Sequence, residues 1–182
     1  MDASVGIVEL RNQFNGLEVL DQLLKSSPIE IVSYQTICPG RTLIITSGSV
    51  SDVLIANEYI RERYEKHIFA TSEIHNIDEK VIEAIKKKNE VESIKAIGTI
   101  ETRSVSHIIK ISDKIVKGYN IEIIKINIGR CASGKGKVVF AGEISSVVSA
   151  IDSVEYDYMD TREIVGTSSV VSPMKETLKY LL

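Results

Sequence analysis

Apolar and polar residues follow two different periods along this chain, and together they predict a mixed α/β protein. Short β-branched runs bounded by turn signals predict strands at residues 6–11, 29–37, 41–46 and 67–74. Apolar residues three or four positions apart predict helices at residues 14–25 and 51–64. Asp78 is a favourable N-cap for a third helix. The expected order is therefore β-α-β-β-α-β, followed by a terminal helix.

The helical spacing also predicts which face of each helix is apolar. In the first helix these positions are Leu17, Leu20, Leu23 and Leu24. In the second helix they are Val53, Ala56 and Ile60, with charged residues at the far end. In the third helix they are Val81, Ile82 and Ile85.

The second half of the chain repeats the first half. Residues 5–9 (VGIVE) resemble residues 97–101 (IGTIE), an offset of 92 positions. Residues 5–34 contain eight identities at this offset, including Asp21 with Asp113 and Lys25 with Lys117. Further along the offset becomes 94, because the second copy has gained two residues. A period this long exceeds that of solenoid repeats and indicates a duplicated small domain.

Each copy has the split β-α-β plan, so the expected fold class is α/β (α+β) with two tandem ferredoxin-like domains. The predicted domains span residues 3–88 and 95–182, joined by a charged stretch at residues 86–93. Helices are expected in the second copy near residues 104–118, 144–158 and 173–181. A ferredoxin-like sheet does not fix a function by itself.

Composition supports a packed core and excludes several function classes. The 182 residues are 43% hydrophobic and 26% charged, and 28 Ile with 18 Val favour strands. A net charge of −3 argues against nucleic-acid binding, which needs clustered Lys and Arg. No apolar run approaches the ~18–20 residues that cross a bilayer, and no secretory signal is recognisable. Two cysteines make no disulfide framework, so a reducing cytosol is the expected compartment.

The motifs of each copy resemble a known family. The Gly-x-x-Glu first strand, the Asp-x-x-x-Lys helix end and the apolar strand-turn-strand that follows resemble the bacterial microcompartment shell domain. Two copies in one chain resemble the tandem-domain shell proteins that form trimers. Residues 36–41 (TICPGR) resemble the pore loop of the iron–sulfur-containing shell proteins of propanediol-utilisation compartments. The turns before the last helices, at 74–78 and 171–173, depart from the Pro-Arg-Pro-like turn of many family members.

This resemblance implies a structural protein rather than an enzyme. Three chains would close into a homotrimer by head-to-tail contacts, and their six domains would form a pseudohexameric tile. Such tiles build the shell of a bacterial microcompartment in the cytoplasm. The implied partners are other shell proteins and redox enzymes, encapsulated or cytosolic, with no nucleic acid and no membrane. Two loops, at residues 37–41 and 128–136, would line the centre of the tile.

Cys38 is the residue on which the metal prediction depends. A lone cysteine is commonly a small buried apolar residue, but Cys38 precedes the turn signal Pro39-Gly40 and is expected to be exposed. An iron–sulfur cluster takes about four thiolates, and one chain has two cysteines in different copies. Three chains around one axis would bring three Cys38 thiolates together, leaving one iron for a non-cysteine ligand. The resemblance therefore implies one 4Fe-4S cluster per trimer, on the threefold axis, that transfers electrons across the shell.

The remaining pore-lining residues come from both hairpin loops. The expected set is Ile37, Pro39, Gly40, Gly129, Arg130, Cys131, Ser133 and Gly134. The spacing of Gly129, Gly134 and Lys135 suggests a phosphate-binding loop, but Gly136 replaces the required Ser/Thr and a strand follows instead of a helix. A flexible pore loop is the favoured interpretation, with Cys131 as an additional ligand the lesser alternative.

Two lysines at matching positions are expected at the tile edge. Lys25 and Lys117 each end the first helix of their copy. The simple interpretation is a solvated charge that complements the helix dipole. The resemblance implies instead that both lysines contact neighbouring tiles.

Other functions stay open at this point. A cluster-free pore would gate metabolites through loop movement, and a regulatory module would bind a small ligand at a subunit interface without forming tiles. An enzyme is the weakest alternative, because no catalytic motif is present. His67, His75 and His107 show no ligand spacing, and Glu9 with Glu101 is expected to have a structural role in each copy.

Overall fold

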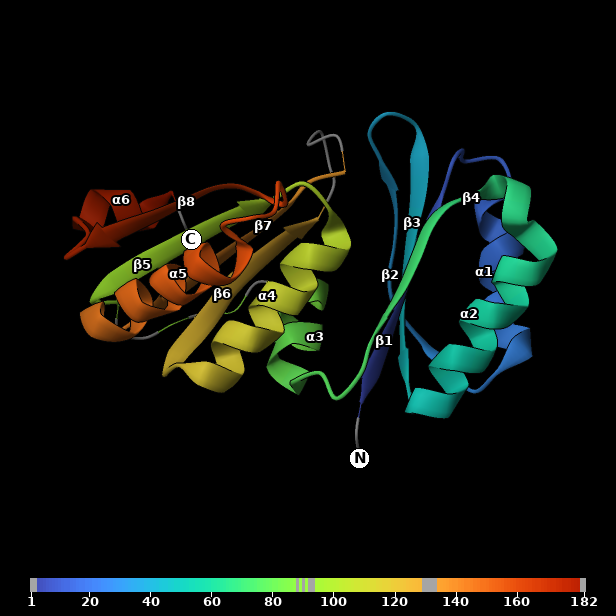
Figure 1. Cartoon of the computed structure of the whole chain (residues 1–182), viewed down its shortest axis with the longest axis horizontal. Helices are drawn as coiled ribbons and strands as arrows, with labels where there is room; N and C mark the ends of the chain where they lie inside the picture. Colours follow the sequence, from blue (N-terminus) through green and yellow to red (C-terminus); the bar gives the residue numbers. More distant parts are fainter. Residues whose placement is uncertain (1–2, 88, 90, 92–93, 129–133, 181–182) are drawn as a thin grey trace. The chain divides into compact units, whose positions relative to one another are not determined.

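Each half of the chain folds into one four-stranded antiparallel sheet with two longer helices packed on it (Figure 1). The computed structural model describes residues 3–87, 89, 91, 94–128 and 134–180. Contacts divide the chain into two units. The first comprises residues 1–82 with 129–134, and the second comprises residues 83–128 with 135–182.

The first unit contains β1 (Ser4–Leu10), α1 (Gly16–Ser26), β2 (Glu30–Ile37), β3 (Arg41–Gly48), α2 (Val50–Tyr64), the 3₁₀ helix η1 (Glu65–His67) and β4 (Ile68–Ile74). Helix α3 (Glu79–Lys86) spans the boundary between the units. The second unit contains β5 (Ala96–Thr102), α4 (Val105–Gly118), β6 (Ile121–Ile128), β7 (Gly136–Gly142), α5 (Ile144–Tyr158), β8 (Ile164–Val171) and α6 (Lys175–Lys179).

Strand order confirms the expected ferredoxin-like plan in both units. The orders are β2-β3-β1-β4 and β6-β7-β5-β8, with every neighbouring pair antiparallel. Register shifts recur at matching places, between Glu9 and Leu10 in β1 and between Glu101 and Thr102 in β5. The duplication therefore preserves the irregularities of the sheet as well as its topology.

Helix α1 differs from its sequence-based prediction. It begins at Gly16 rather than Phe14, and its buried side chains are Val19 and Leu23. Leu17 and Leu24, which were expected on the apolar face, are 68% and 48% exposed. Residues three or four positions apart lie on the same face of an α-helix. Val19 and Leu23 form the face that packs on the sheet, and Leu17 lies outside that face.

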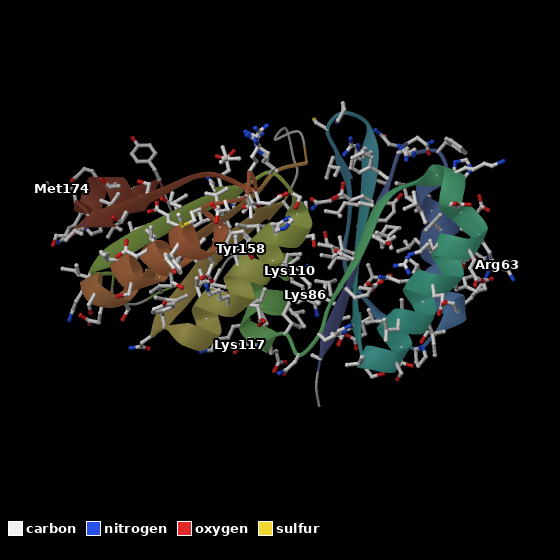
Figure 2. The ribbon with its side chains drawn as sticks, in the orientation of Figure 1. Arg63, Lys86, Lys110, Lys117, Tyr158 and Met174 are labelled. Atoms are coloured by element: carbon white, nitrogen blue, oxygen red, sulfur yellow. The ribbon has the colours of Figure 1, made fainter. Side chains whose placement is uncertain are left out.

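The other helices agree more closely with their predictions. Val53, Ala56 and Ile60 are fully buried on α2, as expected, and α5 spans the predicted range. Side chains cap three helices in the described part of the chain, because Ser49, Asp78 and Ser104 accept hydrogen bonds from the backbone amides of Asp52, Lys80 and His107. The opposite faces carry exposed charged side chains, such as Arg63 on α2 and Lys117 on α4 (Figure 2).

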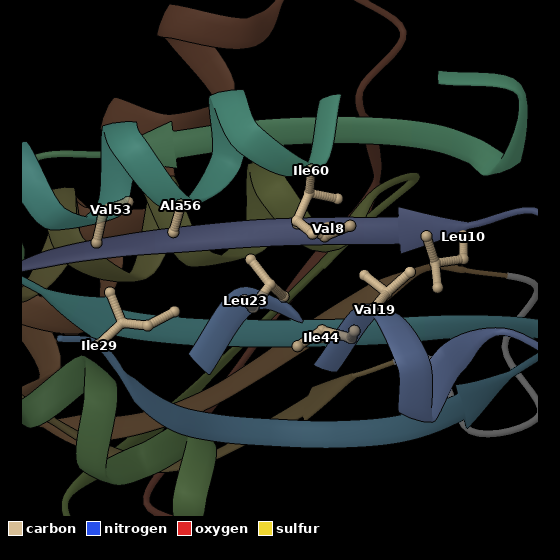
Figure 3. Packing of buried hydrophobic residues seen from close by; sticks show 9 residues of the cluster. All are labelled: Val8, Leu10, Val19, Leu23, Ile29, Ile44, Val53, Ala56 and Ile60. Atoms are coloured by element: carbon tan, nitrogen blue, oxygen red, sulfur yellow. The ribbon is translucent and has the colours of Figure 1, made fainter. Parts of the chain in front are cut away.

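The core of the first unit lies between the sheet and its two helices (Figure 3). Its buried members come from β1, β3, α1, α2 and the turn before β2, and they are Val8, Leu10, Val19, Leu23, Ile29, Ile44, Val53, Ala56 and Ile60. Each fully buried aliphatic side chain of this size stabilises the fold by about 1.5–3 kcal/mol before the loss of conformational entropy. This core holds in place the strands whose ends flank Cys38.

In the second unit, Gly98 lets the Phe140 ring approach the backbone of β5 closely. A Cβ atom on Gly98 of β5 would lie 2.2 Å from Cζ of Phe140 on β7, which is fully buried. A second apolar group covers the sheet through Ile97, Ile124, Val139 and Ala141, against which Leu178 of α6 packs. Both faces of this sheet therefore exclude water near its centre.

Candidate functional site

Cys38 occupies the tip of the β2–β3 hairpin in the first unit. Ile37 pairs with Arg41 across the hairpin, so three residues form the turn. The Cys38–Pro39 peptide bond is cis, and Gly40 has φ +80°, a backbone region that favours glycine. The Cys38 thiol is free and exposed, as expected for a turn residue. Ile37, by contrast, is only 1% exposed, so its side chain anchors the hairpin.

Arg41 fixes the base of this turn by two contacts. Its guanidinium carbon lies 3.3 Å from the centre of the Phe69 ring on β4, and a guanidinium nitrogen lies 3.7 Å from the carboxylate of Glu9 on β1. Three strands therefore meet through one side chain at the base of the turn that carries the exposed thiol. A guanidinium stacked on an aromatic face keeps little rotational freedom, which holds the hairpin in one position.

Glu9 is a buried carboxyl group. Burial raises the pKa of Glu9 from its ordinary value, and the nearby positive charge of Arg41 partly lowers it again. Glu101, its counterpart in the second unit, bonds to Lys135 at 3.1 Å and is more exposed. Each glutamate thus holds a cation where the second strand of its hairpin begins, which agrees with the structural role expected from their matching positions.

The second hairpin falls partly outside the described residues. Of the expected pore residues, Gly129, Arg130, Cys131 and Ser133 lie outside the part of the chain that the structure describes. Gly134 is described, is buried, has φ +80° and belongs to the first unit.

The two lysines expected at the tile edge are paired in the same way. Nζ of Lys25 donates to Asp21 at 2.5 Å, and Nζ of Lys117 donates to Asp113 at 2.7 Å. Both pairs span one helical turn, so the aspartate steers its lysine along the helix surface. Both lysines remain exposed and accessible on α1 and α4.

His107 has a partner that sequence spacing did not reveal. Its Nδ1 lies 2.7 Å from Oγ of Ser104 and 3.0 Å from a carboxylate oxygen of Glu163. The ring also meets Tyr158 edge-on at 6.2 Å. Burial and the negative charge of Glu163 raise the pKa of Tyr158. Fifty-six positions separate His107 from Glu163, and the pairing of β5 with β8 brings them together.

The described residues contain no group of three or more His, Cys, Asp or Glu side chains placed to hold a metal ion. Within the described part of one chain, Cys38 therefore does not belong to such a three-residue group. No helix among the described residues is both long and apolar enough to span a bilayer.

Comparison with known proteins gives one consistent result. A model of the BMC domain matches the chain twice, at residues 4–77 and 96–173. The bacterial microcompartment shell protein PduT of Citrobacter freundii is 31% identical over 151 residues, which cover 83% of this chain and 82% of that protein.

Solved structures share the fold. A microcompartment protein from Desulfitobacterium hafniense superposes with a TM-score of 0.93 at 24% identity, over 98% of this chain and 99% of that one. A double-ringed trimeric shell protein of the RMM microcompartment has a TM-score of 0.62 at 12% identity, over 88% and 84% of the two chains. These likenesses concern the arrangement of the backbone.

Proposed function

We propose that three copies of this chain form one pseudohexameric shell tile. The chain belongs to the BMC domain family of bacterial microcompartment shell proteins and carries two of its domains. The family is structural rather than catalytic, and the chain is a component of a microcompartment shell. A head-to-tail ring of two-domain chains closes with threefold symmetry when it holds six domains. Family membership favours this role over a regulatory module that binds a small ligand.

The tile is proposed to carry an iron–sulfur cluster at its centre, held by Cys38. The observation that supports this role is an exposed free thiol on a short turn whose base is fixed by Arg41 and Glu9. The donor chemistry fits, since thiolates are the ligands of such clusters. One thiol per chain, with no group of three or more ligating side chains in the described part, would need other chains to complete the site. Bound there, the cluster would supply one-electron transfer between the two sides of the shell.

The same tile would place the hairpin loops and the edge lysines at defined positions. The hairpin loops at residues 37–41 and 128–136 would surround the central pore, and Lys25 with Lys117 would meet neighbouring tiles. Redox enzymes on either side of the shell would exchange electrons with the cluster, and other shell proteins would complete the sheet. Without a cluster, the same turn would border an open metabolite pore.

Two measurements on anaerobically purified protein test these proposals separately. Light scattering should give about 61 kDa, three times the 20.2 kDa chain. A monomer, or a hexamer of whole chains, would contradict the tile geometry. Iron analysis after reconstitution should give about four iron atoms per three chains with thiolate-to-iron absorption. A colourless trimer with far less iron would agree with the proposed tile but would contradict the iron–sulfur cluster. It would favour an open metabolite pore instead.

A further inference from the structure

Two exposed phenylalanines lie at the hairpin end of the first unit. The chain has three phenylalanines and no tryptophan. Phe140 is buried in the second unit, whereas Phe14 is 78% exposed in the β1–α1 loop and Phe69 is 43% exposed on β4. Exposed aromatic rings that cluster at one place mark interaction sites more often than single exposed apolar residues do.

Two guanidinium groups contact one of the exposed rings, and an imidazole contacts the other. Arg41 stacks on Phe69, and the guanidinium carbon of Arg11 lies 5.7 Å from the centre of the same ring. The ring of His67 meets Phe14 edge-on at 5.6 Å. The backbone amide of Arg11 donates to the carbonyl of His67 at 2.8 Å, which joins the segments that carry the two groups. Arg11, Phe14, Arg41, His67 and Phe69 are here termed the Phe14–Phe69 surface.

Only one of the two guanidinium groups of this surface has a carboxylate partner. Among the described residues, no carboxylate forms an ion pair with Arg11. Arg41 has Glu9 at 3.7 Å, but this carboxylate is buried beneath the surface. The accessible groups are therefore guanidinium, imidazole and aromatic carbon, on a chain whose net charge is −3.

The second unit serves as an internal control for the fold. Its backbone bond from Arg103 to the carbonyl of Glu163 matches the bond from Arg11 to His67, at the same distance. By the repeat and by strand register, Ser106 stands in place of Phe14, Glu163 in place of His67 and Val165 in place of Phe69. The same sheet forms without the two phenylalanines and the histidine, while Arg103 and Lys135 keep cations at the positions of Arg11 and Arg41, so the sheet topology does not depend on the two exposed aromatic rings.

We propose that the Phe14–Phe69 surface docks a partner protein through an acidic segment that carries an apolar side chain among its carboxylates. Arginine forms forked bonds to carboxylates, and aromatic residues with arginine dominate the binding energy of many interfaces. Because Arg11 and Arg41 already rest on one ring, they lose little freedom on binding. The surface adjoins the Cys38 turn through Arg41, so the partner would dock beside the tip of the first hairpin.

The probe is a fluorescein-labelled peptide of glutamates around a central tryptophan, with a lysine peptide of the same length as its counterpart. Fluorescence anisotropy should show the acidic peptide binding at least tenfold more tightly than the lysine peptide. Affinity should fall several-fold when salt is raised, because the attraction is partly between exposed charges.

The combined variant gives three positions of the first unit the residues found at the matching positions of the second unit. Combining Phe14→Ser, His67→Glu and Phe69→Val should weaken binding of the acidic peptide at least tenfold while circular dichroism stays unchanged. Arg11→Gln alone should weaken binding about threefold or more, whereas the matched variant Arg103→Gln should leave it within about twofold.

Three results would overturn the docking proposal. Equal binding of the two peptides would exclude an acidic partner, and unchanged binding by the combined variant would place the site elsewhere. A change of molecular mass in the combined variant without peptide would mean that a second copy of this chain occupies the surface. The proposal depends on neither the cluster nor the trimer, so a colourless or monomeric protein that bound the acidic peptide as described would still support it.

Discussion

The buried carboxylate of Glu9 lies 3.7 Å from the guanidinium of Arg41, and the pair joins an inner strand of the first sheet to the hairpin that carries Cys38. Arg41 in turn covers Phe69 on the edge strand. The exposed turn therefore stands on a base that combines one charge pair and one aromatic contact.

Glu9 should make stability depend on pH with a defined sign. Its pKa is raised in the folded protein by burial, so the folded state holds this proton more tightly than the unfolded chain. Its contribution is complete below pH 4.5, the ordinary value, and is lost as pH rises through the raised pKa. The free energy of unfolding of the wild type, compared with that of Glu9→Gln, should therefore decrease from acid to neutral pH. Urea denaturation at fixed chain concentration measures this difference.

Arg41→Gln gives the complementary test. Without the guanidinium that lowers the pKa of Glu9, the loss of stability should still begin near the ordinary value of 4.5 but should extend to higher pH. Near neutral pH the variant should be destabilised by about 1–3 kcal/mol, because a buried carboxylate is left without its partner. A difference between wild type and Glu9→Gln that stayed constant across this pH range would show that Glu9 does not titrate as stated.

Cys38→Ser should abolish iron binding while leaving the trimer intact. The turn is exposed and contributes little to the core, so the loss should appear in iron content and absorption, not in mass or circular dichroism. Cys131→Ser is the matched control and should retain iron. Iron that persisted after replacement of Cys38 would refute the ligand assignment even if the tile proved correct.

Lys25→Ala combined with Lys117→Ala should impair the assembly of trimers into sheets. Each lysine is exposed and aligned by an aspartate one turn earlier. Loss of the two helical pairs costs only about 0.2–0.5 kcal/mol each, so the trimer itself should persist. Electron microscopy of the sheets provides the measurement. Lys66→Ala with Lys110→Ala, two other exposed lysines, is the control, and sheets as extensive as those of wild type in the edge variant would reject the role.

Gly98→Ala should destabilise the second unit by about 1–3 kcal/mol, because the new methyl group would overlap the fully buried Phe140 ring. Gly166→Ala, on the neighbouring strand β8, meets nothing within 4 Å and should be neutral or slightly stabilising. Thermal unfolding of the two variants under identical conditions compares them. Equal midpoints would indicate that the ring moves aside without cost.

The amino-acid sequence determined the order of elements, the duplication and the family. These properties depend on residues close together in the chain, whose period of 2 or 3.6 is a local property. Val53, Ala56 and Ile60 could therefore be placed on one face of α2 before the structure was known, and Cys38 could be placed on an exposed turn. The match of Lys25 with Lys117 likewise needed only the repeat.

Only the tertiary structure decided which distant side chains meet. Glu9, Arg41 and Phe69 lie on β1, β3 and β4, and the register of three strands brings them together. The buried face of α1 was predicted only in part for a related reason: Leu23 is buried as expected, but several leucines fit a helical period and only packing against the sheet chooses among them. The Phe14–Phe69 surface emerged in the same way, because exposure and charge balance depend on contacts between segments far apart in the chain.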